Sequence, residues 1–234
     1  MKNFLKLFLI IYILLISIHS SAQNEDVNFR GAWRSGEGVI IFSGNFFSYA
    51  LFEAQSKSFA GTYGGGWSYD NHTITLNMEY NTFDNSIVGQ KINKQAKLDA
   101  GKLIIEGQEF IRIDNGIPGE LEGAWLFSGR KRNDEIQTRD TNQPRKTMKI
   151  LSGTRFQWIA YNTETGAFSG TGGGTYTTID NQYTEDIDFF SRDNSRVGAS
   201  LTFNYELIDG IWNHSGLNSR GEPLYEFWSP RRKR

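Results

Sequence analysis

The sequence has no cysteine, four prolines and only three histidines among its 234 residues. The absence of cysteine excludes disulfide bonds, thiolate metal ligands and a thiol nucleophile. The histidines, at positions 19, 72 and 214, lack the paired spacing that zinc sites use, and no Gly-x-Ser-x-Gly motif marks a nucleophilic serine. We therefore expect no metal, no cofactor and no enzymatic activity.

Long apolar runs are also absent outside the first 22 residues. Two lysines precede an apolar run from Leu7 to Ile18, and small residues ending at Ala22 offer a cleavage site. This pattern predicts a secretory signal peptide over residues 1–22. An uncleaved anchor is the alternative, but the run is shorter than the roughly 20 residues that a membrane-spanning helix needs. Since no cysteine follows to carry a lipid, we expect a secreted or periplasmic protein without a transmembrane segment after cleavage.

The predicted mature chain also lacks an excess of basic charge. Removing the two lysines of the signal peptide from the 25 basic residues leaves 23, against 26 acidic residues, which is a net charge of −3. This balance excludes the basic footprint of a nucleic-acid-binding protein.

Two stretches of the chain repeat one another. FAGTYGGGW at Phe59–Trp67 recurs as FSGTGGGTY at Phe168–Tyr176, an offset of 168 − 59 = 109. The same offset relates Ser43 to Ser152, Phe47 to Phe156, Thr75 to Thr184, Asp84 to Asp193, Val88 to Val197, Leu98 to Leu207 and Gly107 to Gly216. The duplication predicts two similar units, each long enough to bury its own core.

Both units consist of short β-branched and aromatic stretches broken by Gly, Asn or Asp, which is typical of antiparallel all-β structure. The strands predicted for the first unit are residues 30–34, 38–42, 46–52, 58–69, 73–80, 87–98, 102–106 and 109–113. Those predicted for the second, after the strand that carries its first tryptophan, are residues 147–151, 155–162, 167–179, 183–191, 197–208, 211–215 and 223–228. Closing eight consecutive strands into a barrel removes both exposed edges, and the glycine triplets then mark sharp bends. We predict an all-β fold of two tandem, small, eight-stranded antiparallel up-and-down barrels after the signal peptide.

The predicted domain boundaries are residues 28–114 for the first barrel, 115–120 for a turn-rich linker and 121–231 for the second barrel. The second unit begins with LEGAW, which matches FRGAW of the first unit at an offset of 92, so it carries 109 − 92 = 17 extra residues. These fall within residues 130–146, a charged and proline-containing run. We expect either a solvated hairpin or loop, or a lid or partner-binding loop over one barrel mouth.

Gly-x-Trp heads both units, at Gly31–Trp33 and Gly123–Trp125, before an eight-strand meander with an arginine in or just beyond the last strand. In this pattern the repeat resembles the calycin superfamily of lipocalin-like barrels. The second unit is also similar to uncharacterised bacterial secreted lipocalin-like domains, through SGTRFQW at Ser152–Trp158 and YEFW at Tyr225–Trp228.

This resemblance implies a structural role for four residues. Trp33 and Trp125 would each plug one end of a barrel, with Arg112 and Arg231 packed over them in a cation–π contact.

The alternation of polar and apolar residues predicts which side chains of the second unit point inward. On Val197–Leu207 the odd positions are apolar, and on the preceding strand Glu185 lies on the inward face. A carboxylate there must be hydrogen-bonded, paired or hydrated. Glu185 is therefore expected to fix a polar network or an arginine pair, to anchor a ligand, or, as the least favoured of the three, to serve in metal or acid–base catalysis.

The candidate ligand-binding residues of the second unit combine an aromatic wall with a few polar groups. They are Phe156, Trp158, Tyr176, Tyr183, Glu185, Phe203, His214, Glu226 and Trp228. In the first unit the positions of Glu185 and His214 hold Leu76 and Ile105, so a polar site is expected only in the second.

These observations predict a non-catalytic lipocalin-like protein that binds a small apolar or amphipathic molecule in its second barrel. The alternative is an interaction module with filled barrels, in which residues 130–146 or the seam between the units contact an envelope protein or a glycan.

Overall fold

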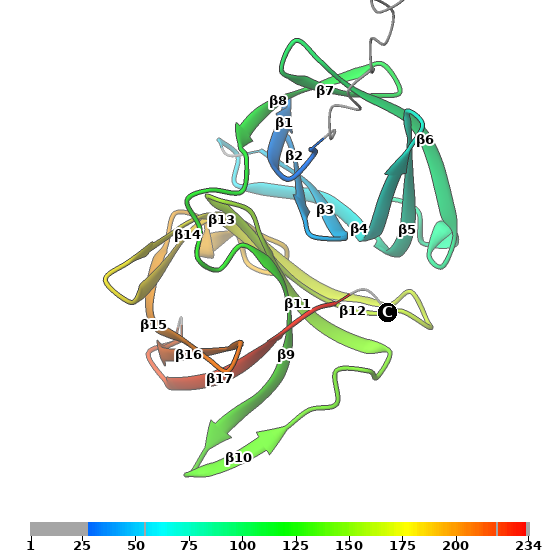
Figure 1. Cartoon of the computed structure of the whole chain (residues 1–234). Coiled ribbons are helices and arrows are strands. Elements are labelled where there is room, and N and C mark those ends of the chain that lie inside the picture. The colour runs from blue at the N-terminus through cyan, green and yellow to red at the C-terminus, as the bar shows by residue number, and fades with distance from the viewer. Residues whose placement is uncertain (1–27, 54, 219, 233–234) are drawn as a thin grey trace, which may run out of the picture.

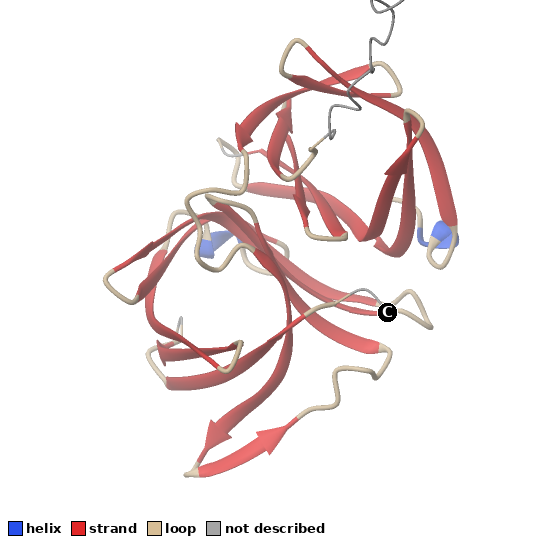
Figure 2. Cartoon of the chain, viewed as in Figure 1, coloured by secondary structure: helices blue, strands red, loops and turns tan. Residues whose placement is uncertain are grey.

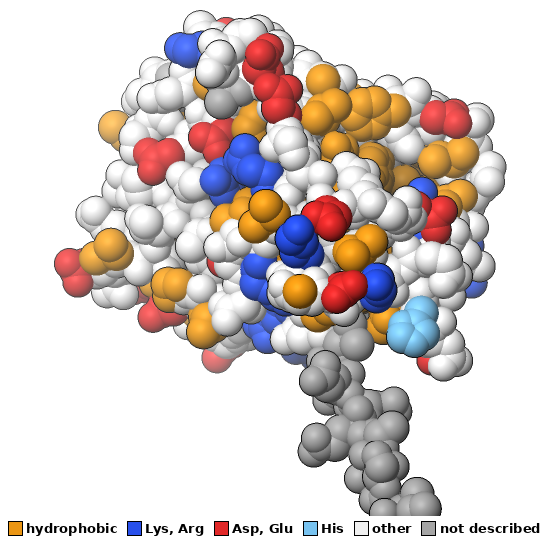
Figure 3. Space-filling model, turned by 90° about the horizontal axis from the view of Figure 1, so that it is seen from above, with side chains coloured by type: hydrophobic (Ala, Val, Ile, Leu, Met, Phe, Trp, Pro, Cys, Tyr) orange, Lys and Arg blue, Asp and Glu red, His pale blue; other side chains and the backbone are white. Residues whose placement is uncertain are grey.

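The computed structural model describes residues 28–53, 55–218 and 220–232, and the predicted signal peptide lies outside them. The described chain is all-β and forms two closed antiparallel barrels of eight strands each, as predicted (Figures 1 and 2). Figure 3 shows that acidic and basic side chains are interspersed over the face seen from above.

The first barrel is a meander in which each strand pairs with the next and β1 pairs with β8. Its strands are β1 (Gly31–Ser35), β2 (Gly38–Ser43), β3 (Phe46–Glu53), β4 (Ser58–Asp70), β5 (Thr73–Asn81), β6 (Lys91–Asp99), β7 (Lys102–Ile105) and β8 (Gln108–Asp114).

The second barrel repeats this order and closes through the pairing of β9 with β17. Its strands are β9 (Gly123–Arg132), β11 (Arg145–Leu151), β12 (Arg155–Asn162), β13 (Phe168–Ile179), β14 (Gln182–Phe190), β15 (Ser200–Ile208), β16 (Ile211–Leu217) and β17 (Pro223–Pro230). An additional strand, β10 (Glu135–Thr138), pairs with the end of β9 in a hairpin that extends away from the barrel (Figure 1). Residues 130–146 thus form the outer part of this hairpin and the return to β11.

The glycine triplets lie at bulges in the strand walls. The register shifts between Gly64 and Gly65 in β4 and between Gly173 and Gly174 in β13. A Cβ atom on Gly65 would lie 2.0 Å from a backbone oxygen of β5, so no other residue fits at this approach of the two backbones.

Two strands begin later than the sequence predicts. Short 3₁₀ helices, η1 (Asn85–Ile87) and η2 (Asn194–Arg196), precede β6 and β15. The side chains of Asp84 and Asp193 accept hydrogen bonds from the backbone two residues ahead and cap these turns. The predicted strands at 87–98 and 197–208 therefore start at Lys91 and Ser200. Leu207, predicted to point inward, is 46% exposed, because β15 runs past the core at that end.

The two barrels pack through equivalent faces. Ser48 and Gln157, which correspond at the offset of 109, hydrogen-bond to each other at 2.5 Å. Two aromatic pairs, Tyr80 with Tyr161 and Phe52 with Phe189, have ring centroids 4.7 and 4.6 Å apart, and the offset converts one pair into the other. This exchange is the signature of a pseudo-two-fold axis, as in an isologous dimer interface.

Candidate binding site in the second barrel

A buried ion pair lies at the centre of the second barrel. Lys149 of β11 and Glu185 of β14 approach to 2.7 Å, and the two residues are 5% and 6% exposed. The ammonium group also lies over the rings of Tyr183, Trp212 and Trp228, 4.9 to 5.2 Å from their centroids. Glu185 thus has the buried pairing that an inward carboxylate requires, with a lysine as its partner.

Sequence reasoning did not identify Lys149. The signal that marks it is the duplication, because the same offset aligns Lys149 with Ile40, a residue of the first barrel's core. Three inward positions of the second barrel, Lys149, Glu185 and His214, therefore carry ionisable groups where the first barrel has aliphatic ones.

The predicted aromatic wall fills the barrel interior around Tyr183. The ring of Tyr183 lies 5.0 to 6.4 Å, centroid to centroid, from those of Phe156, Tyr176, Phe203, Trp212 and His214. All six residues are at most 6% exposed. The space that the sequence assigned to a ligand at this depth is occupied by the side chains themselves.

His214 and Glu226 connect this interior to the surface. The His214 Nδ1 and Glu226 Oε2 atoms are 3.5 Å apart, and the Trp228 indole donates a hydrogen bond of 3.0 Å to Glu226. Burial, together with the positive charge of Lys149, lowers the pKa of His214, which favours the neutral imidazole. Burial opposes ionisation of Glu226, but its contacts with His214, Lys149 and Trp228 hold its pKa below the ordinary value.

Several buried polar atoms of this interior have no hydrogen-bond partner within the described residues. They are the Tyr183 hydroxyl, the Trp212 indole nitrogen and the Nε2 atom of His214, whose Nδ1 atom has only its 3.5 Å contact with Glu226. Leaving a buried polar group unpaired costs about 1–3 kcal/mol, so such groups are usually met by water or by a ligand. Their concentration around His214 marks this part of the barrel as a candidate site.

A cleft of about 570 Å³ lies at the rim of the second barrel and reaches Glu226. It opens where β9 and β17 part, at the end opposite Trp125. Its lining residues are Arg130, Lys131, Arg132, Asn218, Arg220, Glu222, Pro223, Leu224, Tyr225 and Glu226. Four of these carry positive charge and two carry negative charge, so the cleft favours an anionic group. Leu224, which also packs against the barrel core, provides an apolar surface inside it.

The other candidate residues lie apart from this cleft. Trp158 packs on Phe190, with ring centroids 5.5 Å apart, and lies beside Gly172. The indoles of Trp33 and Trp125 each donate a hydrogen bond to the backbone four residues earlier, to Phe29 and Leu121. These equivalent bonds hold both tryptophans at the heads of their barrels.

The two arginines differ in what they cover. Arg112 lies 3.8 Å above the Trp33 ring, and its guanidinium also donates to two backbone oxygens. The expectation that Arg231 covers Trp125 is wrong. Arg231 lies over Phe46 of the first barrel and pairs with Glu79 at 2.6 Å, because β17 ends at the seam between the barrels.

The first barrel contains a small cavity. It measures about 110 Å³ and is lined in part by Ile40, Leu76 and Ile105, the counterparts of Lys149, Glu185 and His214. In the second barrel the same three positions hold the buried polar side chains of Lys149, Glu185 and His214.

Within the described ranges, no three His, Asp or Glu side chains are grouped closely enough to hold a metal ion. No helix among the described residues is long and apolar enough to span a membrane.

Part of the chain matches a known family. Residues 120–228 are similar to a family described as a domain of unknown function (DUF4488). The match covers most of the second unit, and together with the two eight-stranded barrels it fits a lipocalin-like fold. The search of curated proteins found no match.

Proposed function

We propose that the protein is a secreted or periplasmic, non-catalytic binding protein of the calycin type. Its second barrel binds a small, partly apolar molecule at the rim cleft between β9 and β17. The observation that carries this proposal is the lining of the cleft, which combines four basic side chains with the apolar surface of Leu224 and reaches Glu226, 3.5 Å from the buried His214. The contact of Arg112 with Trp33 supports the calycin assignment.

The cleft suggests how such a molecule is held. An apolar part rests on Leu224 and Tyr225, and an anionic group faces Arg130, Arg132 and Arg220. Glu226 lies at the inner end of the cleft, with the buried His214 imidazole behind it at 3.5 Å. The ligand therefore lies at the mouth of a filled barrel.

The test uses anilinonaphthalene sulfonate, a fluorescent dye with one anionic group and an apolar body. We expect one-to-one binding to the folded mature protein, and Leu224→Glu should weaken it by about tenfold or more, which corresponds to about 1.4 kcal/mol. Leu217→Glu is the matched control, because Leu217 is 57% exposed near the same end but does not line the cleft. Equal affinities for the two variants, with circular dichroism showing both folded, would contradict the proposal.

A further inference from the structure

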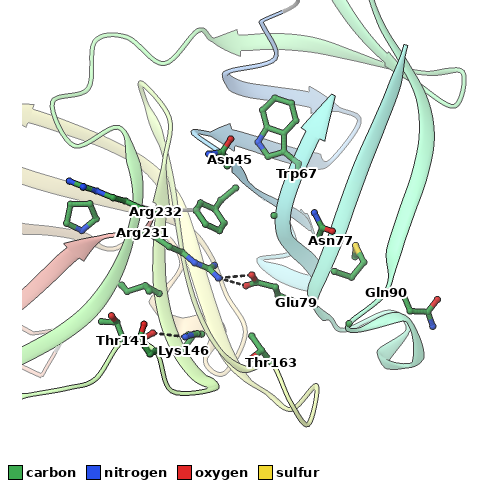
Figure 4. A pocket seen from close by; sticks show the side chains of 17 residues that line it. Asn45, Trp67, Asn77, Glu79, Gln90, Thr141, Lys146, Thr163, Arg231 and Arg232 are labelled. Carbon is green, nitrogen blue, oxygen red and sulfur yellow. Dashed lines mark hydrogen bonds and ion pairs between the residues drawn. The ribbon is translucent and has the colours of Figure 1, made fainter. Parts of the chain in front are cut away.

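A second hollow lies on the seam between the two barrels. It measures about 690 Å³ and is bounded by the first barrel on one side and by the second barrel and the segment after β17 on the other (Figure 4). Asn45, Trp67 and Asn77 come from the first barrel, and Thr141, Lys146 and Thr163 from the second (Figure 4). Thr141 and Lys146 belong to the 17-residue insertion, so this wall has no counterpart in the first unit.

The pseudo-two-fold axis relates this seam groove to a surface of the second barrel that the linker between the barrels covers. The offset of 109 converts the turn Ser43–Asn45, at the edge of the groove, into Ser152–Thr154 of the second barrel. The same backbone hydrogen bond forms at both turns. The N–H of Trp67 donates to the carbonyl oxygen of Asn45, and the N–H of Tyr176 donates to that of Thr154, each at 2.9 Å.

At the second turn the occupant is the polypeptide that links the barrels. A Cβ atom on Gly153 would lie 2.6 Å from the backbone of Ile117, and one on Gly119 would lie 2.5 Å from the Tyr176 hydroxyl. Asp114 anchors this segment through hydrogen bonds from the hydroxyls and backbone N–H groups of Ser152–Thr154. An extended segment that begins with a carboxylate, that of Asp114, thus fits against the turn Ser152–Thr154.

At the equivalent turn of the first barrel, no described residue covers Gly44. A Cβ atom on Gly44, the counterpart of Gly153, would meet nothing within 4 Å. The Ser43 hydroxyl donates to Glu122 at 2.6 Å, and the groove beyond it is not filled by any residue that the structure describes. Among the described residues, a peptide segment therefore lies at one of the two pseudo-symmetric sites and none lies at the other.

The charges of the groove favour an acidic occupant. Arg231, Arg232 and Lys146 line it, against a single carboxylate, that of Glu79, which Arg231 neutralises at 2.6 and 2.8 Å. Pro230 pairs with Trp125 as Arg112 pairs with Trp33, so the last strands of the two barrels correspond at an offset of 230 − 112 = 118. At this offset the counterpart of Asp114 is Arg232, which is exposed. A cation thus replaces the anchoring carboxylate.

Side-chain amides complete the lining. Asn45, Asn77, Gln90 and Asn142 offer both donors and acceptors, which match the N–H and C=O groups of an extended backbone.

We propose that the seam groove binds an acidic, extended peptide segment of a partner protein, in the manner in which the linker binds the equivalent face of the second barrel. This site is independent of the rim cleft proposed for the small ligand.

The test uses a synthetic peptide with the linker sequence DNGIPGEL, residues 114–121, labelled with a fluorophore and titrated with the mature protein. Fluorescence anisotropy should show saturable binding in the range of about 0.1–1 mM that suits a short, weakly anchored peptide. Raising the salt concentration should weaken it, because the attraction is between exposed charges. A peptide with Asn and Gln in place of its two acidic residues should bind at least several-fold more weakly.

Two charge reversals separate this site from the rim cleft. Arg232→Glu should weaken peptide binding about tenfold and leave dye binding unchanged, whereas Arg132→Glu should do the reverse. Both arginines are exposed, so neither change threatens the fold. As a second probe, Asn142→Trp should obstruct the groove from the insertion side.

Three results would overturn the proposal. They are no binding at millimolar protein, equal binding of the amide peptide, and equal loss in the two arginine variants. Sedimentation of the mature protein as a dimer that Arg232→Glu disperses would assign the groove to a second copy of the chain instead.

Discussion

The two barrels share a strand order and differ in what their strands enclose. Ile40, Leu76 and Ile105 line the small cavity of the first barrel, and the same positions of the second barrel hold a lysine, a glutamate and a histidine. The backbone pairing that builds the fold tolerates either set. The two barrels therefore share one backbone framework and differ in the chemistry of their interiors through these inward side chains.

The largest expected effect comes from breaking the buried ion pair. Glu185→Leu, which installs the residue of the first barrel, should destabilise the protein by about 3–5 kcal/mol, because it leaves the Lys149 charge buried and unpaired. The free energy of unfolding from urea titration measures this loss.

The double variant Lys149→Ile and Glu185→Leu transplants the first barrel's pair. It should recover most of the lost stability, because aliphatic side chains of similar volume can replace a buried pair. A double variant as unstable as Glu185→Leu alone would show that the two barrels differ in more than these residues.

A smaller effect concerns the arginines at the barrel ends. Arg112→Leu should cost about 1–2 kcal/mol through the lost contact with Trp33 and the lost backbone hydrogen bonds. In a Trp33→Phe background the loss should shrink, and a double-mutant cycle on unfolding free energies measures the coupling. Arg231→Leu should show no coupling to Trp125→Phe, because Arg231 lies over Phe46. A measured coupling between Arg231 and Trp125 would contradict the conclusion that only Arg112 covers the tryptophan of its barrel.

The smallest expected effect is a dependence of stability on pH. The folded protein lowers the pKa of His214, so between the ordinary value of about 6.5 and the folded value the unfolded chain binds more protons. Stability should therefore fall as the pH drops from about 7 to about 5. His214→Ile, which copies Ile105, should flatten this slope in urea titrations at several pH values. An unchanged slope would show that the pH dependence of stability comes from another titrating group.

Sequence alone predicted the duplication, the strand order and the inward position of Glu185, because each depends on local patterns. Repetition is visible in the letters, and alternation along β14 separates Tyr183, Glu185 and Ile187 from their polar neighbours. Leu76 and Ile105 line the small cavity of the first barrel, which agrees with the predicted absence of polar residues at these two positions.

Contacts between the barrels could not be predicted in the same way. On β11 the apolar residues Met148 and Ile150 face the seam, and the charged Lys149 faces the barrel interior. Alternation taken by itself assigns these faces in reverse, because it assumes that the apolar side faces the barrel's own core. Arg231 was misplaced for a related reason, since its partner Glu79 lies 152 residues away in the other barrel.

The central claim is that the small ligand binds at the rim of the second barrel and not in the cavity of the first. Amide NMR spectra of the mature protein, recorded during titration with anilinonaphthalene sulfonate, test it most directly. We predict that the shifts concentrate in Arg130–Arg132 and in Leu224–Glu226, on either side of the cleft. Shifts concentrated around Leu76 and Ile105, in the cavity of the first barrel, would contradict it.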